Sequence, residues 1–313
     1  MFNSSWPGRQ PRRSVAARLA VALLGWVGLL SVGPAGAAGT LDKVRSSGEL
    51  VIGYRVDAVP FSYSLPGQTQ PVGYAIDLCR SFADALRKEL KLPALQVRYL
   101  AVDNRERFPA LVEGRIDLEC ANTTNTRERR EKIGVAFTIP HYIAGTRMMV
   151  RADSGIQRLD DLQGKTVVTT RGTTSVGILQ QKDRELGLRL QIQECDEDKQ
   201  CFERLSRKQA DAYMMDDILL YSFRAASPTP EAFSVVGKFM SIEPLAVMMR
   251  KDDPAFKKVI DTEMLRLIYE RELQRLYSRW FEAPIPPQNT NLRVPMSYLQ
   301  RDFLKFPSDS VAD

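Results

Sequence analysis

The strongest constraint on the fold is the alternation of short apolar runs with longer stretches of helical periodicity. Leu50–Arg55 and Gln96–Val102 are two such runs, and Ile76–Leu90 between them places apolar residues three or four positions apart. A short helix is predicted at Pro109–Gly114, with proline early and glycine late as helices favour. Ile116–Ala121 is the third apolar run. This β-α-β-α-β order predicts a parallel sheet covered by helices.

The same order restarts after residue 145. A strand at Thr146–Arg151 opens a second unit. Its further strands are predicted at Lys165–Thr170, Arg189–Gln193, Asp211–Met215 and Ser234–Phe239, and its helices at Ser175–Leu186, Phe202–Lys208 and Asp217–Ala226. Met248 and Met249 repeat the pair at Met148 and Met149. Two similar strands thus flank one inserted unit, and we expect the chain to cross into a second lobe and return.

These patterns predict an α/β protein of two lobes. Residues 38–144 would form the first part of lobe 1, residues 145–242 lobe 2, residues 243–282 the return to lobe 1, and residues 283–313 a C-terminal extension. The helical stretch Pro254–Phe281 would pack on lobe 1. The tail from Ala283 is rich in Pro and Asn, and we expect it to run extended over the surface.

Residues 1–37 have the features of a secretory signal peptide. Four arginines precede an apolar run at Leu19–Val32, and Ala35-Gly36-Ala37 provides the small residues of a cleavage site. The run is shorter than the ~20 residues that span a bilayer. Cleavage removes four of the 44 basic residues and none of the 38 acidic ones, which lowers the net charge from +6 to +2. Nucleic-acid binding thereby loses its main support.

The four cysteines of an exported chain are expected to form disulfides. Cys195 and Cys201 bracket a short loop and are the first predicted pair, which leaves Cys79 with Cys120, or those two as buried thiols. His141 is the only histidine. A Ser-His-Asp or Cys-His mechanism and a metal site are therefore disfavoured, and we expect no metal and no cofactor.

Polar side chains cluster where the predicted strands end. Arg55 follows the first strand, Asn122 and Thr124 follow the third, and a Gly flanked by hydroxyls precedes the helix at Ser175. Ligands of open α/β sheets bind at the carboxyl ends of strands, and the start of a helix favours an anion. The P-loop pattern GxxxxGK[ST] is absent. Arginines and hydroxyls can bind the carboxylates of an amino acid, and one carboxylate can bind its ammonium.

Motifs along most of the chain support this reading. In order they are LDKVRSSGELVIGYR, PFSY, DLECANTTNTRERR, TTRGTTS, AYMMDD, MRKDDP, RWF and APIPPQN. In this order and spacing the chain resembles the periplasmic solute-binding proteins of polar amino-acid ABC transporters, in the glutamate/aspartate-binding branch. The resemblance implies a two-lobed periplasmic binding protein fold of type II. Each lobe would be a mostly parallel sheet flanked by helices, with two crossing strands joining the lobes.

The resemblance also implies roles for individual residues. Arg129 would bind the α-carboxylate, with Thr124, Thr173 and Thr170 as neighbouring partners, Asp216 would receive the α-ammonium, and Arg55 and Arg107 would face an acidic side chain. Asn122 replaces a serine of close relatives and keeps its hydrogen-bonding capacity. Asp217 is expected to cap a helix. The partners implied are a small amino acid and an inner-membrane ABC permease, with the protein periplasmic and monomeric.

One position departs from the family. Close relatives carry a histidine where this chain has Asp198, within CDEDKQC. A carboxylate there would repel an acidic ligand unless it turns away or pairs with Arg55 or Arg171. Glutamine or asparagine is the alternative ligand. A cyclohexadienyl-dehydratase-like enzyme and a ligand-sensing role are the alternatives to transport, and Asp216 with Arg129 favours amino-acid binding over the enzyme.

Overall fold

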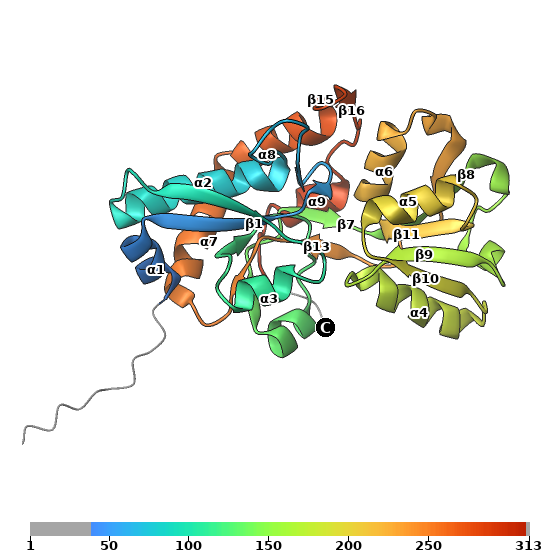
Figure 1. Cartoon of the computed structure of the whole chain (residues 1–313), viewed down its shortest axis with the longest axis horizontal. Coiled ribbons are helices and arrows are strands. Elements are labelled where there is room, and N and C mark those ends of the chain that lie inside the picture. Colours follow the sequence, from blue (N-terminus) through green and yellow to red (C-terminus); the bar gives the residue numbers. More distant parts are fainter. Residues whose placement is uncertain (1–38, 311–313) are drawn as a thin grey trace, which may run out of the picture. The chain divides into compact units, whose positions relative to one another are not determined.

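The computed structural model describes residues 39–310, so the predicted signal peptide lies outside the described residues. Two five-stranded sheets form the framework, with strand orders β4-β1-β5-β14-β6 and β10-β9-β11-β8-β12. Helices flank both sheets (Figure 1). No helix in residues 39–310 is long and apolar enough to cross a bilayer. The α/β class, with two mostly parallel sheets, is as predicted.

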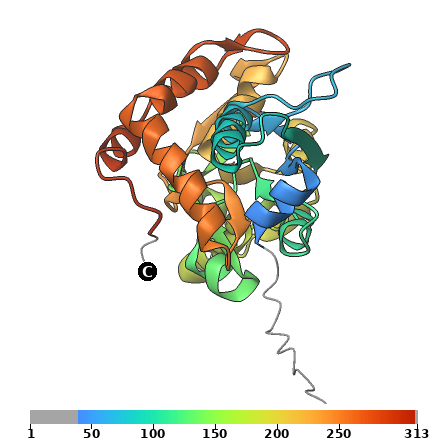
Figure 2. The same cartoon turned by 90° about the vertical axis from the view of Figure 1, so that its left-hand side faces the viewer.

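The first sheet combines an early and a late part of the chain. Its strands are β1 (Glu49–Tyr54), β4 (Gln96–Ala101), β5 (Leu118–Glu119), β6 (Val135–Phe137) and β14 (Met248–Arg250). Strand β1 runs parallel to β4 and β5, whereas β14 is antiparallel to β5 and β6. The accompanying helices are α1 (Thr40–Ser47), α2 (Tyr74–Leu90), α3 (Arg107–Val112), η1 (Arg129–Ile133), α7 (Pro254–Tyr269), α8 (Glu272–Tyr277) and η5 (Ser278–Glu282), and α2 packs on α7 (Figure 2).

The second sheet is formed by one continuous part of the chain. Its strands are β8 (Thr146–Arg151), β9 (Thr166–Thr170), β10 (Gln191–Cys195), β11 (Ala212–Asp216) and β12 (Phe233–Val236). Strands β10, β9 and β11 are parallel, and β8 is antiparallel to β11 and β12. The helices are η2 (Ala152–Ser154), η3 (Leu159–Leu162), α4 (Thr174–Leu186), α5 (Asp198–Ser206), α6 (Asp217–Ala226) and η4 (Pro230–Ala232).

Two short strands carry the chain between the sheets. Strand β7 (Tyr142–Ala144) leads from β6 to β8, and β13 (Glu243–Leu245) leads from β12 to β14. The two pair antiparallel, with Ile143 opposite Pro244. A short hairpin of β2 (Asp57–Ala58) and β3 (Ser62–Tyr63) follows β1 in the chain.

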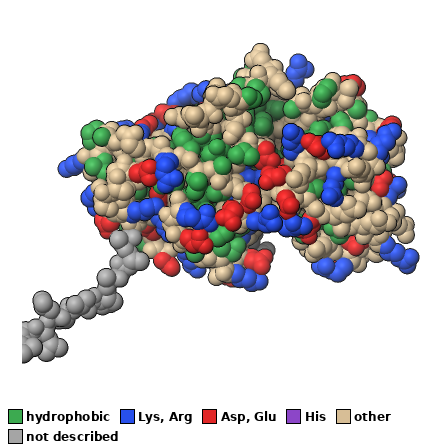
Figure 3. Space-filling view, in the orientation of Figure 1, with side chains coloured by type: hydrophobic (Ala, Val, Ile, Leu, Met, Phe, Trp, Pro, Cys, Tyr) green, Lys and Arg blue, Asp and Glu red, His purple; other side chains and the backbone are tan. Residues whose placement is uncertain are grey.

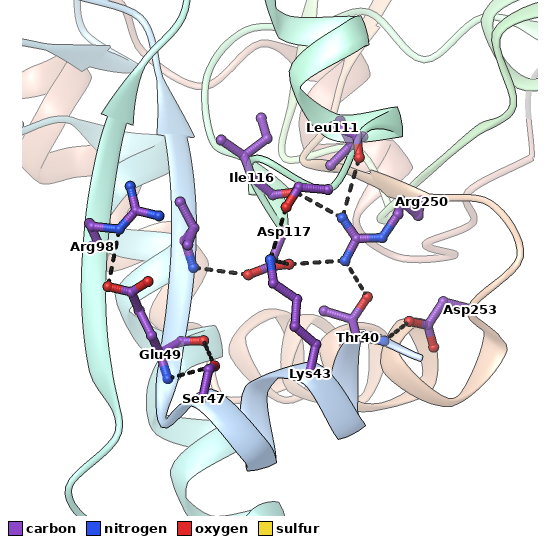
Figure 4. A network of polar contacts seen from close by, with 12 residues as sticks. Thr40, Lys43, Ser47, Glu49, Arg98, Leu111, Ile116, Asp117, Arg250 and Asp253 are labelled. Carbon is purple, nitrogen blue, oxygen red and sulfur yellow. Dashed lines mark hydrogen bonds and ion pairs between the residues drawn. The ribbon is translucent and has the colours of Figure 1, made fainter. Parts of the chain in front are cut away.

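A buried carboxylate fastens the N-terminal helix and the returning strand to the first sheet. Asp117 is fully buried, and its oxygens accept hydrogen bonds from Lys43 Nζ at 2.8 Å and Arg250 Nη2 at 2.9 Å (Figure 4). Val51 N donates to the same carboxylate at 3.0 Å. Asp117 therefore joins α1, β1 and β14, which lie far apart in sequence.

Both predicted disulfides are confirmed. Cys79 and Cys120 join α2 to the segment after β5, across 41 positions of sequence. Cys195 and Cys201 join the end of β10 to α5, across six positions. The second bridge closes the loop that carries Asp198.

Two helical predictions differ most from the observed bounds. Helix α5 begins at Asp198, four residues before the predicted Phe202, so Asp198 lies in its first turn. The single helix expected from Pro254 is interrupted after Tyr269, because Arg271 adopts a left-handed conformation with φ of 60° that an α-helix cannot contain.

The C-terminal extension is more structured than the composition indicates. It forms a hairpin of β15 (Pro284–Ile285) and β16 (Thr290–Asn291), followed by α9 (Tyr298–Phe303). The side chain of Ser297 caps α9 by accepting from Gln300 N at 3.0 Å. Gln300 is 2% exposed, and its Oε1 accepts from Ile143 N at 2.6 Å while its Nε2 donates to His141 O at 3.4 Å. The extension is thereby attached to the crossing strand β7.

His141 is a structural residue beside the crossing, as expected. Its ring is fully buried among aromatic side chains, with ring centroids 5.8 Å from Phe61 and 5.5 Å from Tyr74. Burial disfavours the imidazolium and lowers the pKa of His141 to about 3.

Replacing Gln300 by alanine should weaken the attachment of the extension. The partly buried Ile143 N–H would lose its acceptor, which costs about 1–3 kcal/mol. Urea unfolding should show this loss for Gln300→Ala. Tyr298→Ala, an exposed position on the same helix, should change the free energy of unfolding by less than about 0.5 kcal/mol. Equal losses for the two variants would contradict the attachment.

The buried His141 should make the protein less stable in acid. The unfolded chain binds a proton at this histidine below about pH 6.5, whereas the folded protein binds it only near pH 3. Between these values the free energy of unfolding should fall with falling pH by up to about 1.4 kcal/mol per pH unit from this group. His141→Phe should flatten the slope measured from pH 6.5 to 4. Phe61→Leu, in the same aromatic cluster, should lower stability without changing the slope.

Candidate ligand-binding site

Seven of the eight predicted ligand-binding side chains are almost fully buried. Their exposed fractions are Arg55 1%, Arg107 2%, Asn122 5%, Thr124 5%, Arg129 8%, Thr170 0% and Asp216 3%. They come from both sheets, since Arg55 follows β1, Thr170 ends β9 and Asp216 ends β11. Thr173 is only half-buried, and its Oγ1 donates to Thr170 O at 2.6 Å.

The loop between β9 and α4 meets the first lobe's residues through its glycine. Arg107 Nη2 donates to Gly172 O at 3.0 Å. Gly172 has a φ of +76°, and a Cβ added to it would lie 3.0 Å from Asn104 O. Both the backbone conformation and the close approach require glycine here. This stretch is the one in which the sequence indicates an anion site.

Arg129 is a buried cation that donates one side-chain hydrogen bond within residues 39–310. Its Nη1 donates to Thr124 O at 2.7 Å, and its guanidinium lies 5.2 Å from the ring centre of Phe108. Burial lowers the pKa of Arg129, although the carboxylates of Glu243, Glu119 and Asp216 oppose that shift. A planar guanidinium in such surroundings is suited to bind a carboxylate through two hydrogen bonds.

Asp216 is a buried carboxylate on which other negative charges act most strongly. Its pKa is raised well above the ordinary value, first by burial and then by Glu243, Asp217 and Asp198, while a hydrogen bond with Asn122 opposes the shift. The neighbouring charges that act most strongly on Asp216 are therefore carboxylates. A cation placed beside Asp216 would relieve this repulsion.

Asp217 does not serve as the conventional helix cap that the sequence predicts. Asp216 occupies the N-cap position of α6, and no side-chain cap hydrogen bond forms there. The Asp217 carboxylate instead accepts from Gly145 N at 3.3 Å. It thereby connects α6 to the crossing segment.

Arg107 is hydrogen-bonded to neutral groups. Its Nη1 donates to Thr123 Oγ1 at 2.8 Å, and its Nε has no hydrogen-bond partner within residues 39–310. Burial lowers the pKa of Arg107 to about 9, and the positive charges of Arg129 and Arg55 contribute. An anion near Arg107 would stabilise its charged form.

Arg55, in contrast, is surrounded by carboxylates. Its Nη2 lies 3.0 Å from Asp57 Oδ1, 3.7 Å from Asp198 Oδ2 and 3.8 Å from Glu197 Oε2. Burial would lower the pKa of Arg55, but these carboxylates, with Asp198 the strongest, raise it overall. Asp198 therefore pairs with Arg55, which is one of the two arginines considered from the sequence. Arg171, the other, pairs with Glu194 at 3.0 Å.

Three acidic residues of this region, Glu119, Glu243 and Asp57, were not identified from the sequence. Glu119 is fully buried in β5, and neither carboxylate oxygen has a hydrogen-bond partner in the described chain. Glu243 in β13 accepts from Thr174 Oγ1 at 2.9 Å. Asp57 and Glu197 contact Arg55, and the pKa of Asp57 is raised to about 6, first by burial and then by Asp198. In the sequence, the position of Asp57 two residues after Arg55 was the one signal that could have identified it as a partner of Arg55.

A groove opens beside these residues. Its volume is about 750 Å³, and Arg129, Gly172, Thr173 and Glu243 contribute to its lining. No group of three or more His, Cys, Asp and Glu side chains in residues 39–310 is arranged to hold a metal ion. Charged side chains of both signs are mixed on the face shown in Figure 3.

Comparison with known proteins identifies similar chains. The model of the family "bacterial extracellular solute-binding proteins, family 3" matches residues 50–283. The L-glutamate/L-aspartate-binding protein of Pseudomonas aeruginosa is 37% identical over 275 residues, covering 88% of this chain and 90% of that protein. The glutamate/aspartate import solute-binding protein of Escherichia coli K12 is 35% identical over 300 residues, covering 96% and 98%.

A solved structure extends the likeness to the fold. The ancestral amino acid-binding protein AncCDT-1, a precursor of cyclohexadienyl dehydratase, has a TM-score of 0.66 and 26% identity. The match covers 78% of this chain and 100% of that one.

Proposed function

Because the chain belongs to family 3 of the bacterial extracellular solute-binding proteins, we propose that it binds an acidic amino acid and delivers it to an ABC importer. The two relatives with 35–37% identity are named for glutamate and aspartate. The match to the first covers 88% of this chain. The ligand class of this chain is thus inferred from both the relatives and the residues of the site.

The observation that carries the proposal is that a buried arginine, Arg129, and a buried carboxylate, Asp216, belong to one region of the protein. Within residues 39–310 the Arg129 guanidinium donates one hydrogen bond, to Thr124 O, and the charges that act most strongly on Asp216 are carboxylates. An α-amino acid supplies a charge opposite to each, its carboxylate to Arg129 and its ammonium to Asp216. Thr124, Thr170, Thr173 and Asn122 would supply hydrogen bonds around the α-carbon. Hydrogen bonds to charged groups contribute about 1.5–3 kcal/mol each.

The distal carboxylate of an acidic amino acid would bind near Arg107. Its Nε has no hydrogen-bond partner within residues 39–310 and burial lowers its pKa, so an added anion would stabilise its charged form. Arg55 would contribute positive charge, although its own carboxylates offset much of it.

Transport then requires only binding and release. The ligand touches groups from both sheets, so its binding favours the conformation in which these groups are close together. The crossing strands β7 and β13 are the segments about which the lobes would move. We propose that the predicted signal peptide directs the chain to the periplasm, where an inner-membrane permease receives the closed form. No chemical step is proposed, and the charge pattern at Arg129 and Asp216 fits amino-acid capture better than catalysis.

A ligand panel tests the proposal. L-glutamate or L-aspartate at 100 times its dissociation constant should stabilise the protein by about 2.7 kcal/mol, which raises the melting temperature by about 5–10 °C for a protein of this size. Differential scanning fluorimetry should show no shift with nucleotides or sugars. A shift with phosphates and none with any amino acid would refute the proposal.

Removing the charge of Asp216 should separate ligand binding from folding. Asp216→Asn would leave the ammonium without its counter-charge in a dry site, at a cost of about 3–5 kcal/mol. Calorimetry should therefore show an affinity loss of about a hundredfold or more. Asp211→Asn is the matched control, because Asp211 precedes the other end of β11 and accepts from Thr166 N at 3.0 Å. Comparable affinity for Asp216→Asn and wild type would show that the ammonium binds elsewhere.

A further inference from the structure

One end of the proposed site contains unpaired donors and an unpaired acceptor together. Asp198 Oδ2 is buried and has no hydrogen-bond partner in the described chain, and the same holds for Asn104 Nδ2 and Arg107 Nε. All three side chains are at most 2% exposed. Buried polar atoms without partners are rare in native proteins, and each calls for a ligand, water or strain.

Two of these three groups contact the guanidinium of Arg55. Arg55 Nη1 donates to Asn104 Oδ1, and Arg55 Nη2 lies 3.7 Å from Asp198 Oδ2. Arg107 is acted on by the charges of both Arg55 and Asp198. Arg107 Nη2 also donates to Gly172 O, and a Cβ on Gly172 would lie 3.0 Å from Asn104 O. Arg55 and Gly172 therefore link the three residues into one group of neighbours.

Asp198 is held at this position by three independent features. It is in the first turn of α5, where a helix favours a negative charge. Tyr213 OH donates to its Oδ1 at 3.3 Å. The Cys195–Cys201 disulfide closes the loop that contains Asp198. Asp198 is thus a fixed part of the site.

Arg55 already has protein counter-anions. Asp57 at 3.0 Å, with Asp198 and Glu197 at 3.7 and 3.8 Å, provides more negative charge than one guanidinium balances. A ligand carboxylate at this end can accept hydrogen bonds from Arg107 and Asn104, but it also meets the Asp198 carboxylate. An ionised carboxylate has no donor to offer Asp198 Oδ2.

A carboxamide matches the whole set of unpaired atoms. Its NH₂ can donate to Asp198 Oδ2, and its carbonyl oxygen can accept from Arg107 Nε or Asn104 Nδ2. A site that hydrogen-bonds both ends of an amide discriminates for it, because each mismatch leaves a buried polar group unpaired.

We propose that Asp198 is a specificity-determining residue that extends the ligand range from glutamate and aspartate to glutamine and asparagine. This inference rests on the proposed function, since Arg129 and Asp216 hold the amino-acid end of every ligand. Asp198 lowers the affinity for the acid and raises that for the amide. The two dissociation constants in the wild-type protein therefore lie within about tenfold of each other, a range of about 1.4 kcal/mol.

The test is the ratio of dissociation constants for L-glutamine and L-glutamate, measured by calorimetry on the mature protein after unfolding and refolding to remove bound ligand. Asp198→Asn keeps the shape and removes the charge, and it should shift the ratio at least tenfold toward glutamate. Asp196→Asn is the control. Asp196 lies on the same loop, is half exposed and pairs with Arg171 at 2.5 Å. It should change both affinities alike and leave the ratio unchanged.

The outcomes separate this inference from the proposed function. Glutamate binding with glutamine more than tenfold weaker in wild type overturns the role of Asp198 and leaves the proposed function intact. A ratio of the glutamine and glutamate dissociation constants that is unchanged in Asp198→Asn also overturns the role of Asp198 and leaves the proposed function intact. Loss of binding for every amino acid in the wild-type protein overturns both. If Asp198→Asn fails to fold, Asp198→Ser replaces it, and the wild-type ratio decides without any variant.

Discussion

The burial of three guanidinium groups in one region is the constraint on which the site depends. Removing a charge from water costs several kcal/mol, and this cost is recovered only where opposite charges and hydrogen bonds are close. Arg55, Arg107 and Arg129 are opposed by Glu119, Asp198, Asp216 and Glu243, all nearly inaccessible. Two of the compensating contacts, Arg55 with Asp198 and Arg107 with Gly172 O, join residues of different sheets. The electrostatic balance therefore exists only while the lobes are together.

The positive and negative charges are unevenly distributed along the site, so a zwitterionic ligand can complement both. The charges that act most strongly on Asp216 are negative, whereas burial and the charge of Arg129 act most strongly on Arg107. Around Arg55 the protein supplies its own carboxylates. A ligand with an ammonium at one position and acceptors at others stabilises the closed arrangement more than the open one, where water solvates the same groups. The preference for closure is thus a consequence of desolvation.

The crossing strands connect this electrostatic preference to the rest of the fold. Strands β7 and β13 pair with each other, Gln300 of α9 binds the backbone of β7, and Asp217 binds Gly145 N just after it. His141 fills the aromatic cluster beside the same strand. The segment about which we propose that the lobes move is therefore supported from both lobes and from the C-terminal extension, and its stiffness would affect how readily the site opens.

Local patterns in the sequence determined the class of fold, the two disulfides and most of the strand and helix positions. Apolar periodicity, proline and glycine placement and cysteine spacing act within a few residues, so they can be recognised without coordinates. The resemblance to a family added candidate roles for residues such as Arg129 and Asp216. Only the tertiary structure decided that Asp198 starts a helix and pairs with Arg55, and that Gln300 attaches the C-terminal helix to β7. It also decided that Glu119 and Glu243 are buried, and Asp57 half-buried, beside the arginines. These contacts join positions from 2 to 157 apart in the chain, and their energies depend on burial and on the charges of distant segments, which no local pattern encodes.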